Sequence, residues 1–211
     1  MKGDITQLIQ NNKAWAEEIT SRDPNFFDQL SSHQSPQFLW IGCSDSRVPP
    51  NQIAGALPGE IFTHQNVGNL VQINDVNCMS AVKFALEELE VTNIVLCGHY
   101  GCGAIKAIIE NTAEGLLKKW LEPIAHLYQK NKIELSDLSA DLAYRRLVEL
   151  NVLAQVNSLC RSSSVLDRWT NKSSLNIYAL AYDIGNGLLK DLGVKISSKD
   201  DLFEFQRSAY F

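Results

Sequence analysis

Two short runs of this sequence are almost continuously apolar, and each ends beside a residue type that binds metals. The runs cover residues 37–42 and 93–98, and Cys43 and His99 follow them directly. Strands that are apolar on both faces are typical of a parallel sheet covered on both sides. Residues 76–89, between the two runs, carry apolar side chains at helical spacing, and a strand, a crossover helix and a strand form the unit of a parallel sheet. The sequence therefore predicts an α/β fold with a mostly parallel central sheet flanked by helices.

Weaker patterns complete the predicted sheet and its helices. Residues 60–64 are expected to form a third strand, and the alternation of apolar and polar residues over 175–182 predicts a further strand. Turn-forming residues follow, so that residues 188–190 are expected to return as an antiparallel edge strand. Helices are expected over residues 114–130, with a break or turn at Pro123, and over residues 138–161.

The N-terminal segment carries a helical pattern of its own. Apolar residues at helical spacing predict an amphipathic helix over residues 4–20, whose apolar stripe requires a surface to cover, either on its own domain or on a partner subunit. Pro24, Pro36 and the polar run over residues 31–35 mark loops. A chain of 211 residues falls within the usual size of one domain. We therefore expect a single domain over residues 1–211, in which residues 1–35 form an N-terminal helical arm.

Charge, hydropathy and cysteine content argue against several classes of protein. A net charge of −5 argues against a nucleic-acid partner, which requires a basic surface. No stretch approaches the roughly 18 apolar residues of a membrane-spanning helix, and the N-terminus lacks the apolar core of a secretion signal. Five cysteines, an odd number without paired spacing, indicate a reducing compartment. The expected location is the cytoplasm, and an organellar form whose leader has been removed is the alternative.

Cys43, His99 and Cys102 form the donor set of a predicted zinc site. Small structural zinc sites hold their ligands in two tight pairs, whereas here one strand end offers Cys43 and another offers a His99-x-x-Cys102 motif. The carboxyl ends of neighbouring parallel strands meet at one edge of a sheet, where the sites of α/β proteins form. Two thiols and one imidazole leave a fourth position for water, as in catalytic zinc sites. We expect one Zn²⁺ per chain.

Glycines surround the second motif. Gly98, Gly101 and Gly103 are expected to let the backbone turn sharply, so that His99 and Cys102 point at one metal. A phosphate-binding loop is the alternative interpretation of these glycines, but no Gly-Lys-Ser/Thr sequence follows them.

Asp45 and Arg47 lie two and four residues after the first ligand. Zinc lowers the pKa of a bound water from about 15.7 toward 7, which supplies a nucleophile at neutral pH. Asp45 either binds the fourth position and closes the site, or accepts a hydrogen bond from the nucleophile and orients it. Arg47 can hold Asp45 in a bidentate pair away from the metal. The alternative role of this pair is an ordinary salt bridge within the loop.

Two motifs give the chain a resemblance to a known family. They are Cys43-Ser44-Asp45-Ser46-Arg47 and Gly98-His99-x-x-Cys102-Gly103, supported by Leu39-Trp40-Ile41-Gly42, Pro58-Gly59-Glu60 and Asn66-Val67-Gly68-Asn69. With these motifs the chain resembles the β-class carbonic anhydrases, zinc enzymes that interconvert carbon dioxide and bicarbonate. The resemblance implies a lyase (carbonate dehydratase) with Cys43, His99 and Cys102 as zinc ligands and Asp45 with Arg47 as the catalytic dyad. It also implies a homodimer or homotetramer in which the N-terminal helix packs across the partner.

Within that family, the sequence is most similar to bacterial members that carry a Trp before the Ile-Gly-Cys run and a Tyr late in the chain, here Trp40 and Tyr182. In those relatives Trp, Tyr and an Arg line a non-catalytic bicarbonate pocket, which is linked to a closed state with the Asp on zinc. Gln65 occupies the position of that Arg, and Ala104 replaces a second Gly. The resemblance therefore implies a bicarbonate pocket of Trp40, Gln65 and Tyr182 without a guanidinium group.

Two other functions stay open from the sequence. Hydrolysis of carbon disulfide or carbonyl sulfide is an enzymatic alternative within the same fold, because both molecules are linear heteroallenes like carbon dioxide. A non-catalytic protein that binds zinc and senses or stores bicarbonate is an alternative from another class. A stopped-flow assay of carbon dioxide hydration distinguishes the three functions.

Overall fold

The structure, a computed structural model, describes residues 3–207 and divides the chain into two compact units that meet in sequence at Ser35 and Pro36. Residues 1, 2 and 208–211 of the expected domain lie outside the described part. None of the helices within residues 3–207 combines the length and the apolar content that crossing a membrane requires.

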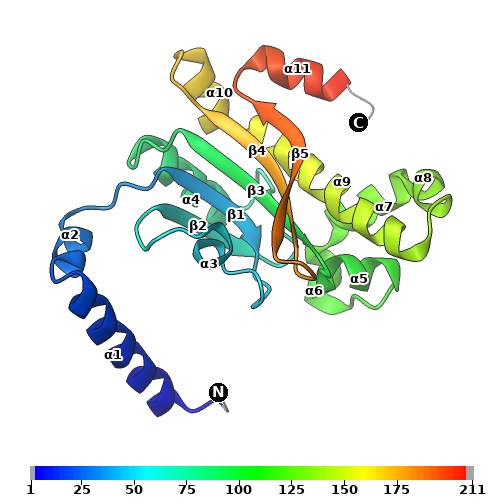
Figure 1. Ribbon diagram of the computed structural model, residues 1–211. Helices are drawn as coiled ribbons and strands as arrows, with labels where there is room; N and C mark the ends of the chain where they lie inside the picture. Colours follow the sequence, from blue (N-terminus) through cyan, green and yellow to red (C-terminus); the bar gives the residue numbers. More distant parts are fainter. Residues whose placement is uncertain (1–2, 208–211) are drawn as a thin grey trace. The chain divides into compact units, whose positions relative to one another are not determined.

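The first unit consists of two helices, α1 (Ile5–Arg22) and α2 (Phe26–Ser32) (Figure 1). The side chain of Asp4 caps α1 by accepting a hydrogen bond from the backbone N–H of the second residue of the helix. Trp15 of α1 packs edge-on against Phe27 of α2, with 5.8 Å between the ring centroids. The expected N-terminal helix is therefore present, and it is followed by a second short helix that the sequence pattern did not indicate.

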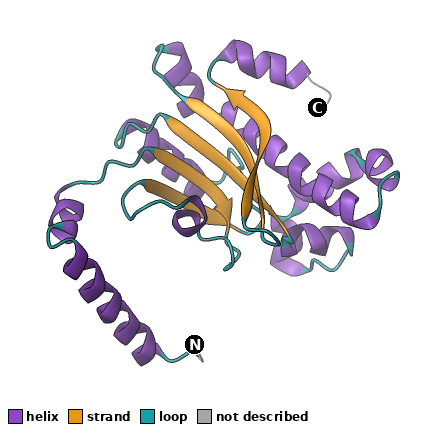
Figure 2. Cartoon of the chain, viewed as in Figure 1, coloured by secondary structure: helices purple, strands orange, loops and turns teal. Residues whose placement is uncertain are grey.

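The second unit is built around a five-stranded sheet in the order β2-β1-β3-β4-β5 (Figure 2). The strands are β1 (Phe38–Cys43), β2 (Ile61–Asn66), β3 (Asn93–Tyr100), β4 (Asn176–Asp183) and β5 (Leu188–Ile196). The first four are parallel to one another, and β5 pairs antiparallel with β4. The predicted mostly parallel sheet with an antiparallel edge is confirmed.

Helices of the second unit include those predicted over residues 76–89, 114–130 and 138–161, together with several short helices that the sequence pattern did not indicate. They are α3 (Pro50–Ala54), α4 (Val76–Glu87), α5 (Gly103–Ile109), α6 (Gly115–Trp120), α7 (Glu122–Lys130), α8 (Lys132–Ser136), α9 (Ala140–Cys160), α10 (Ser163–Thr170) and α11 (Lys199–Arg207). The expected helix over residues 114–130 is divided between α6 and α7 at Leu121. Pro123 lies in the first turn of α7, where its missing N–H leaves no helix hydrogen bond unmade.

The two faces of the sheet differ in what covers them. Residues in register on neighbouring strands point to the same face, so alternate residues of each strand form two separate sets. One set, which includes Leu39, Ile94 and Ile177, joins the largest core cluster together with residues of α4, α9 and α10. The other set forms a smaller cluster around Trp40 and Val95.

Helix α9 approaches the sheet very closely. It packs on β3 and β4, and a Cβ atom added at Gly98 of β3 would lie only 2.6 Å from Cγ2 of Val152. Polar side chains of α9 also reach the loop after β2. Asn151 Nδ2 donates to the Gly68 carbonyl at 2.9 Å, and Gln155 Oε1 accepts from the Val71 N–H at 2.8 Å. This helix therefore supports both the core and the loops at the carboxyl ends of the strands.

Candidate metal centre

Cys43, His99 and Cys102 meet at the carboxyl ends of β1 and β3. Cys43 is the last residue of β1, His99 lies near the end of β3, and Cys102 is the N-cap residue of α5. One donor atom from each residue lies within 4.8 Å of the other two, and all three side chains are buried. Because β1 and β3 are hydrogen-bonded neighbours, residues far apart in sequence come together at one sheet edge.

The three glycines around the second motif have different roles in the structure. Gly101 has a φ of 82°, a left-handed conformation that favours glycine, and it lies between the two ligands of the motif. Gly98 and Gly103, which are both described, do not adopt this left-handed conformation. The expectation that all three glycines permit sharp turns was therefore wrong for Gly98 and Gly103, and Gly98 is required by the close approach of α9.

His99 offers one ring nitrogen to a metal. Its Nδ1 lies 3.2 Å from the Tyr100 carbonyl oxygen and donates to it in the tautomer that leaves a lone pair on Nε2. Nε2 is buried and has no hydrogen-bond partner in the described part of the chain. A buried polar atom left without a partner costs roughly 1–3 kcal/mol. An ion held by Nε2 and both sulfur atoms would remove that cost, so the donor set fits a metal.

The two thiols of the site have opposite pKa shifts. A hydrogen bond with Cys102 lowers the pKa of Cys43 to about 4, against the effect of burial, and His99 lowers it further. The same hydrogen bond raises the pKa of Cys102, and burial adds to the rise. The pair therefore releases its first proton easily, and thiolates are the form that binds metals. By contrast, burial raises the pKa of both Cys78 and Cys97 to about 12, which is typical of inert core cysteines.

Asp45 and Arg47 form a bidentate pair beside the donor set. Arg47 Nε donates to Asp45 Oδ1 at 2.9 Å, and Arg47 Nη2 donates to Asp45 Oδ2 at 2.6 Å. These hydrogen bonds hold the pKa of the Asp45 carboxyl well below its usual range. Arg47 Nη2 also donates to the Gly101 carbonyl at 3.0 Å, and Asp45 Oδ2 lies 3.8 Å from His99 Nε2. An ionised carboxylate is thus fixed next to the three donor atoms.

The three residues expected to line a bicarbonate pocket lie on one face of the sheet. Gly42 pairs in register with Gln65, and Trp40 precedes Gly42 by two residues, so these side chains share a face. The indole of Trp40 lies over Gly42, where an added Cβ would be 2.8 Å from Nε1. Tyr182 packs against the same small cluster as Trp40.

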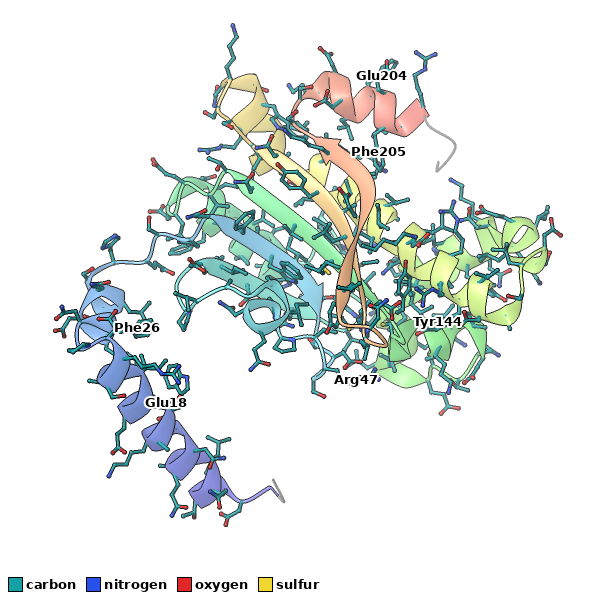
Figure 3. All side chains as sticks on the ribbon, viewed as in Figure 1. Glu18, Phe26, Arg47, Tyr144, Glu204 and Phe205 are labelled. Atoms are coloured by element: carbon teal, nitrogen blue, oxygen red, sulfur yellow. The ribbon has the colours of Figure 1, made fainter. Side chains whose placement is uncertain are left out.

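Two contacts with the ligands were not predicted from the sequence. Gln65 Nε2 donates to the Cys43 carbonyl at 2.8 Å, and the Tyr144 hydroxyl donates to the Cys102 carbonyl at 2.7 Å. Tyr144 comes from α9, far along the chain, and it lies with Arg47 at the same end of the sheet (Figure 3). No spacing in the sequence indicates either contact, because each joins elements that only the fold brings together.

Comparisons with known proteins agree with this geometry. The sequence model of the family described as "Carbonic anhydrase" matches residues 38–189. The chain is 38% identical over 189 residues to a carbonic anhydrase of Emericella nidulans, an alignment that covers 89% of this chain and 83% of the relative. The solved structure of the Coccomyxa β-carbonic anhydrase in complex with acetazolamide has a TM-score of 0.90 at 38% identity, covering 95% of this chain and 91% of that one. Tetrameric β-carbonic anhydrases from Sordaria macrospora give a TM-score of 0.88 at 32% identity, with 92% and 98% coverage.

The donor set predicts which cysteine is required for metal binding. The Cys102→Ala variant is expected to lose most of its zinc, because two protein ligands and an open site hold the ion much more weakly than three. Metal analysis of the purified proteins measures this directly, with one zinc per chain expected for the unchanged protein. Cys78→Ala is the matched control, since it removes a buried thiol from the core and leaves the donor set intact. Full zinc retention in Cys102→Ala would show that Cys102 is not a ligand.

Proposed function

Because the chain belongs to the β-carbonic anhydrase family, we propose that it catalyses the reversible hydration of carbon dioxide to bicarbonate and a proton. The observation that carries this proposal is the buried cluster of Cys43, His99 and Cys102 with the Asp45–Arg47 pair beside it. Such an enzyme is a lyase, a carbonate dehydratase. Hydrolysis of carbon disulfide or carbonyl sulfide and non-catalytic bicarbonate binding are less well supported, because the matched relatives are named carbonic anhydrases.

Cys43, His99 and Cys102 are the residues that would hold one Zn²⁺ per chain. The two thiolates balance the charge of the ion, and the neutral imidazole of His99 completes three of the four positions that zinc prefers. A bound zinc ion supplies Lewis-acid activation of water near neutral pH.

Asp45 is suited to orient the attacking water. Its low pKa keeps it ionised, so it acts as a hydrogen-bond acceptor and cannot serve as a proton donor near neutral pH. Both of its oxygen atoms accept from Arg47, which fixes the direction of the remaining lone pairs. Arg47 thereby keeps the carboxylate beside the three donors and prevents it from moving among them. The proton that the reaction releases passes to buffer.

Removal of either member of the pair is expected to lower hydration strongly. Asp45→Asn and Arg47→Ala should each reduce kcat/KM by about 100-fold, the lower end of the usual effect of a positioned acid–base group, while zinc stays bound. Stopped-flow hydration with a pH indicator and metal analysis on the same samples provide the two measurements. Glu110→Gln, which removes a carboxylate from an exposed pair with Lys106, is the control. Rates close to that of the unchanged protein in both variants would leave the pair as a loop salt bridge.

We further propose that Trp40, Gln65 and Tyr182 bind bicarbonate away from the metal. Their common sheet face supports this pocket, and the Gln65 amide has a second N–H besides the one bound to Cys43. A neutral hydrogen bond contributes about 0.5–1.5 kcal/mol, against about 1.5–3 kcal/mol for a bond to a charged group. The pocket therefore binds bicarbonate more weakly than one that contains an arginine. The likeness to bacterial members, from which this pocket is inferred, stays a prediction.

The Gln65→Arg variant is expected to be more strongly inhibited by bicarbonate. A gain of about 1 kcal/mol corresponds to roughly fivefold tighter binding, because each 1.4 kcal/mol is tenfold. Hydration is measured at rising bicarbonate and constant ionic strength for both proteins. Arginine has enough N–H groups to replace the Gln65 contact with Cys43 as well as to meet the anion. Superimposable inhibition curves of the two proteins would show that Gln65 is not part of a bicarbonate site.

We propose that the protein forms a homo-oligomer, a dimer or a tetramer. The tetrameric Sordaria relatives support this, and the apolar stripe of α1 is exposed in the single chain, with Ile5 at 66% and Ile9 at 60% exposure. Sedimentation equilibrium is expected to give two or four chains per particle. The Ile5→Glu, Ile9→Glu double variant should shift the particles toward monomer, while Gln10→Glu, on the opposite side of the same helix, should not. A monomer in the unchanged protein would contradict the proposal.

A cytoplasmic location is supported by the cysteines, since all five are free in the structure, as is usual in reducing compartments. An organellar form is supported by a relative from Arabidopsis thaliana named "Beta carbonic anhydrase 6, mitochondrial", which is 32% identical over 168 residues. Fractionation of the source cells decides between the two locations.

A further inference from the structure

Both thiol ligands have their own backbone carbonyl held by a side chain from another element. Gln65 of β2 donates to the carbonyl of Cys43, and Tyr144 of α9 donates to the carbonyl of Cys102. Since His99 donates through Nδ1 to the carbonyl of Tyr100, each member of the donor set has one fixed partner outside the metal position.

The Cys102 carbonyl lies where the chain changes from a loop to a helix. Cys102 is the N-cap of α5, and its side chain makes no capping hydrogen bond. The carbonyl accepts the first hydrogen bond of the helix from Lys106 N at 3.1 Å, and Tyr144 adds a second hydrogen bond from outside the helix. Gly101, in its left-handed conformation, precedes the ligand. The direction of the Cys102 side chain therefore depends on how firmly this one peptide group is held.

Helix α9 is held in place by residues next to Tyr144, so the position of Tyr144 is fixed. The neighbouring Arg145 places its guanidinium 3.7 Å from the ring centroid of Tyr100 and donates to Asp183 Oδ2 at 2.8 Å. One turn further along α9, Glu149 accepts from the Tyr100 hydroxyl at 2.6 Å. The helix thus holds the ligand loop at Tyr100 as well as at Cys102.

Gln65 acts on the other ligand from the neighbouring strand. Cys43 is the last residue of β1, where regular pairing with β2 ends, and Gln65 lies one position before the end of β2. Its amide is partly buried and spans the two strands at this point. Cys43 is therefore held by a side chain of β2 in addition to the backbone pairing of the two strands.

We propose that Gln65 and Tyr144 are positioning residues that fix the directions of the Cys43 and Cys102 sulfur atoms before metal binding. A carbonyl that cannot rotate fixes the backbone dihedral angle beside it and, with it, the direction of the Cα–Cβ bond that carries the sulfur atom. A donor set arranged in advance loses less conformational freedom when the ion binds, and outer partners of metal ligands commonly contribute 10–100-fold in affinity. The inference rests on the metal centre of the proposed function, but its test does not depend on hydration activity.

Gln65→Met and Tyr144→Phe remove only the donor groups and keep nearly the same side-chain volume. Each is expected to weaken zinc binding about tenfold, and the double variant about 100-fold, because the two residues act on separate ligands. Zinc affinity is measured by competition with a chromophoric chelator at fixed pH. Cobalt-substituted proteins give a second readout, since their sulfur-to-metal and d–d absorption bands report the ligand geometry. Both kinds of absorption band are expected to shift in each variant relative to the unchanged protein.

Matched controls are Gln72→Met and Tyr128→Phe, whose side chains make no hydrogen bond within the described residues. The urea unfolding of every metal-free protein is measured in parallel. Zinc affinities within twofold of the unchanged protein, with superimposable cobalt spectra, would overturn the proposal. Lower stability of the metal-free variants with unchanged zinc affinity would overturn it also, because that result describes a structural role alone. If only one variant loses zinc affinity, the residue changed in the other variant is not a positioning residue. Absence of zinc binding in the unchanged protein would instead remove the metal centre itself.

Discussion

The pairing between β1 and β3 determines where the functional side chains of the second unit lie. Phe38 pairs with Asn93 and Gly42 with Cys97, so both strands end at the same edge and deliver Cys43 and His99 together. A shift of one residue in either strand would move Cys43 by about 3.3 Å along the sheet relative to His99. The apolar residues buried on both faces prevent that shift, because it would exchange the contents of two different clusters.

The site depends on polar atoms that the fold buries without a full set of protein partners. His99 Nε2 has no hydrogen-bond partner among residues 3–207, and the thiols of Cys43 and Cys102 are buried beside it. These groups are tolerated because the surrounding backbone is held by independent contacts, from Arg47 to the loop carbonyl at Gly101 and from α9 to the loops on either side. Contacts of the sheet, the ligand loop and helix α9 thus together offset the free-energy cost of burying these polar groups.

Much of this arrangement follows from the sequence, and the reasons for the exceptions are physical. Continuous apolar runs located β1 and β3, and the spacing of Asp45 and Arg47 was enough to expect their pairing, because residues two apart in a turn reach each other easily. Strand β5 was expected only over residues 188–190 but extends to Ile196, since an edge strand with several exposed residues has a weak apolar pattern. The contacts of Gln65 and Tyr144 with ligand carbonyls leave no pattern, because they depend on how distant elements pack. The assigned roles of the site residues stay predictions.

Gly98 shows how a motif can combine two unrelated requirements. It stands next to a metal ligand, yet its backbone is ordinary, and the space for its missing Cβ is filled by Val152 of α9. The glycine therefore belongs to the interface between helix and strand, while His99 belongs to the chemistry. In a set of related sequences, residues 98 and 152 would accordingly be expected to covary in size. A larger residue at 98 would require a smaller one at 152, independently of any change at the metal.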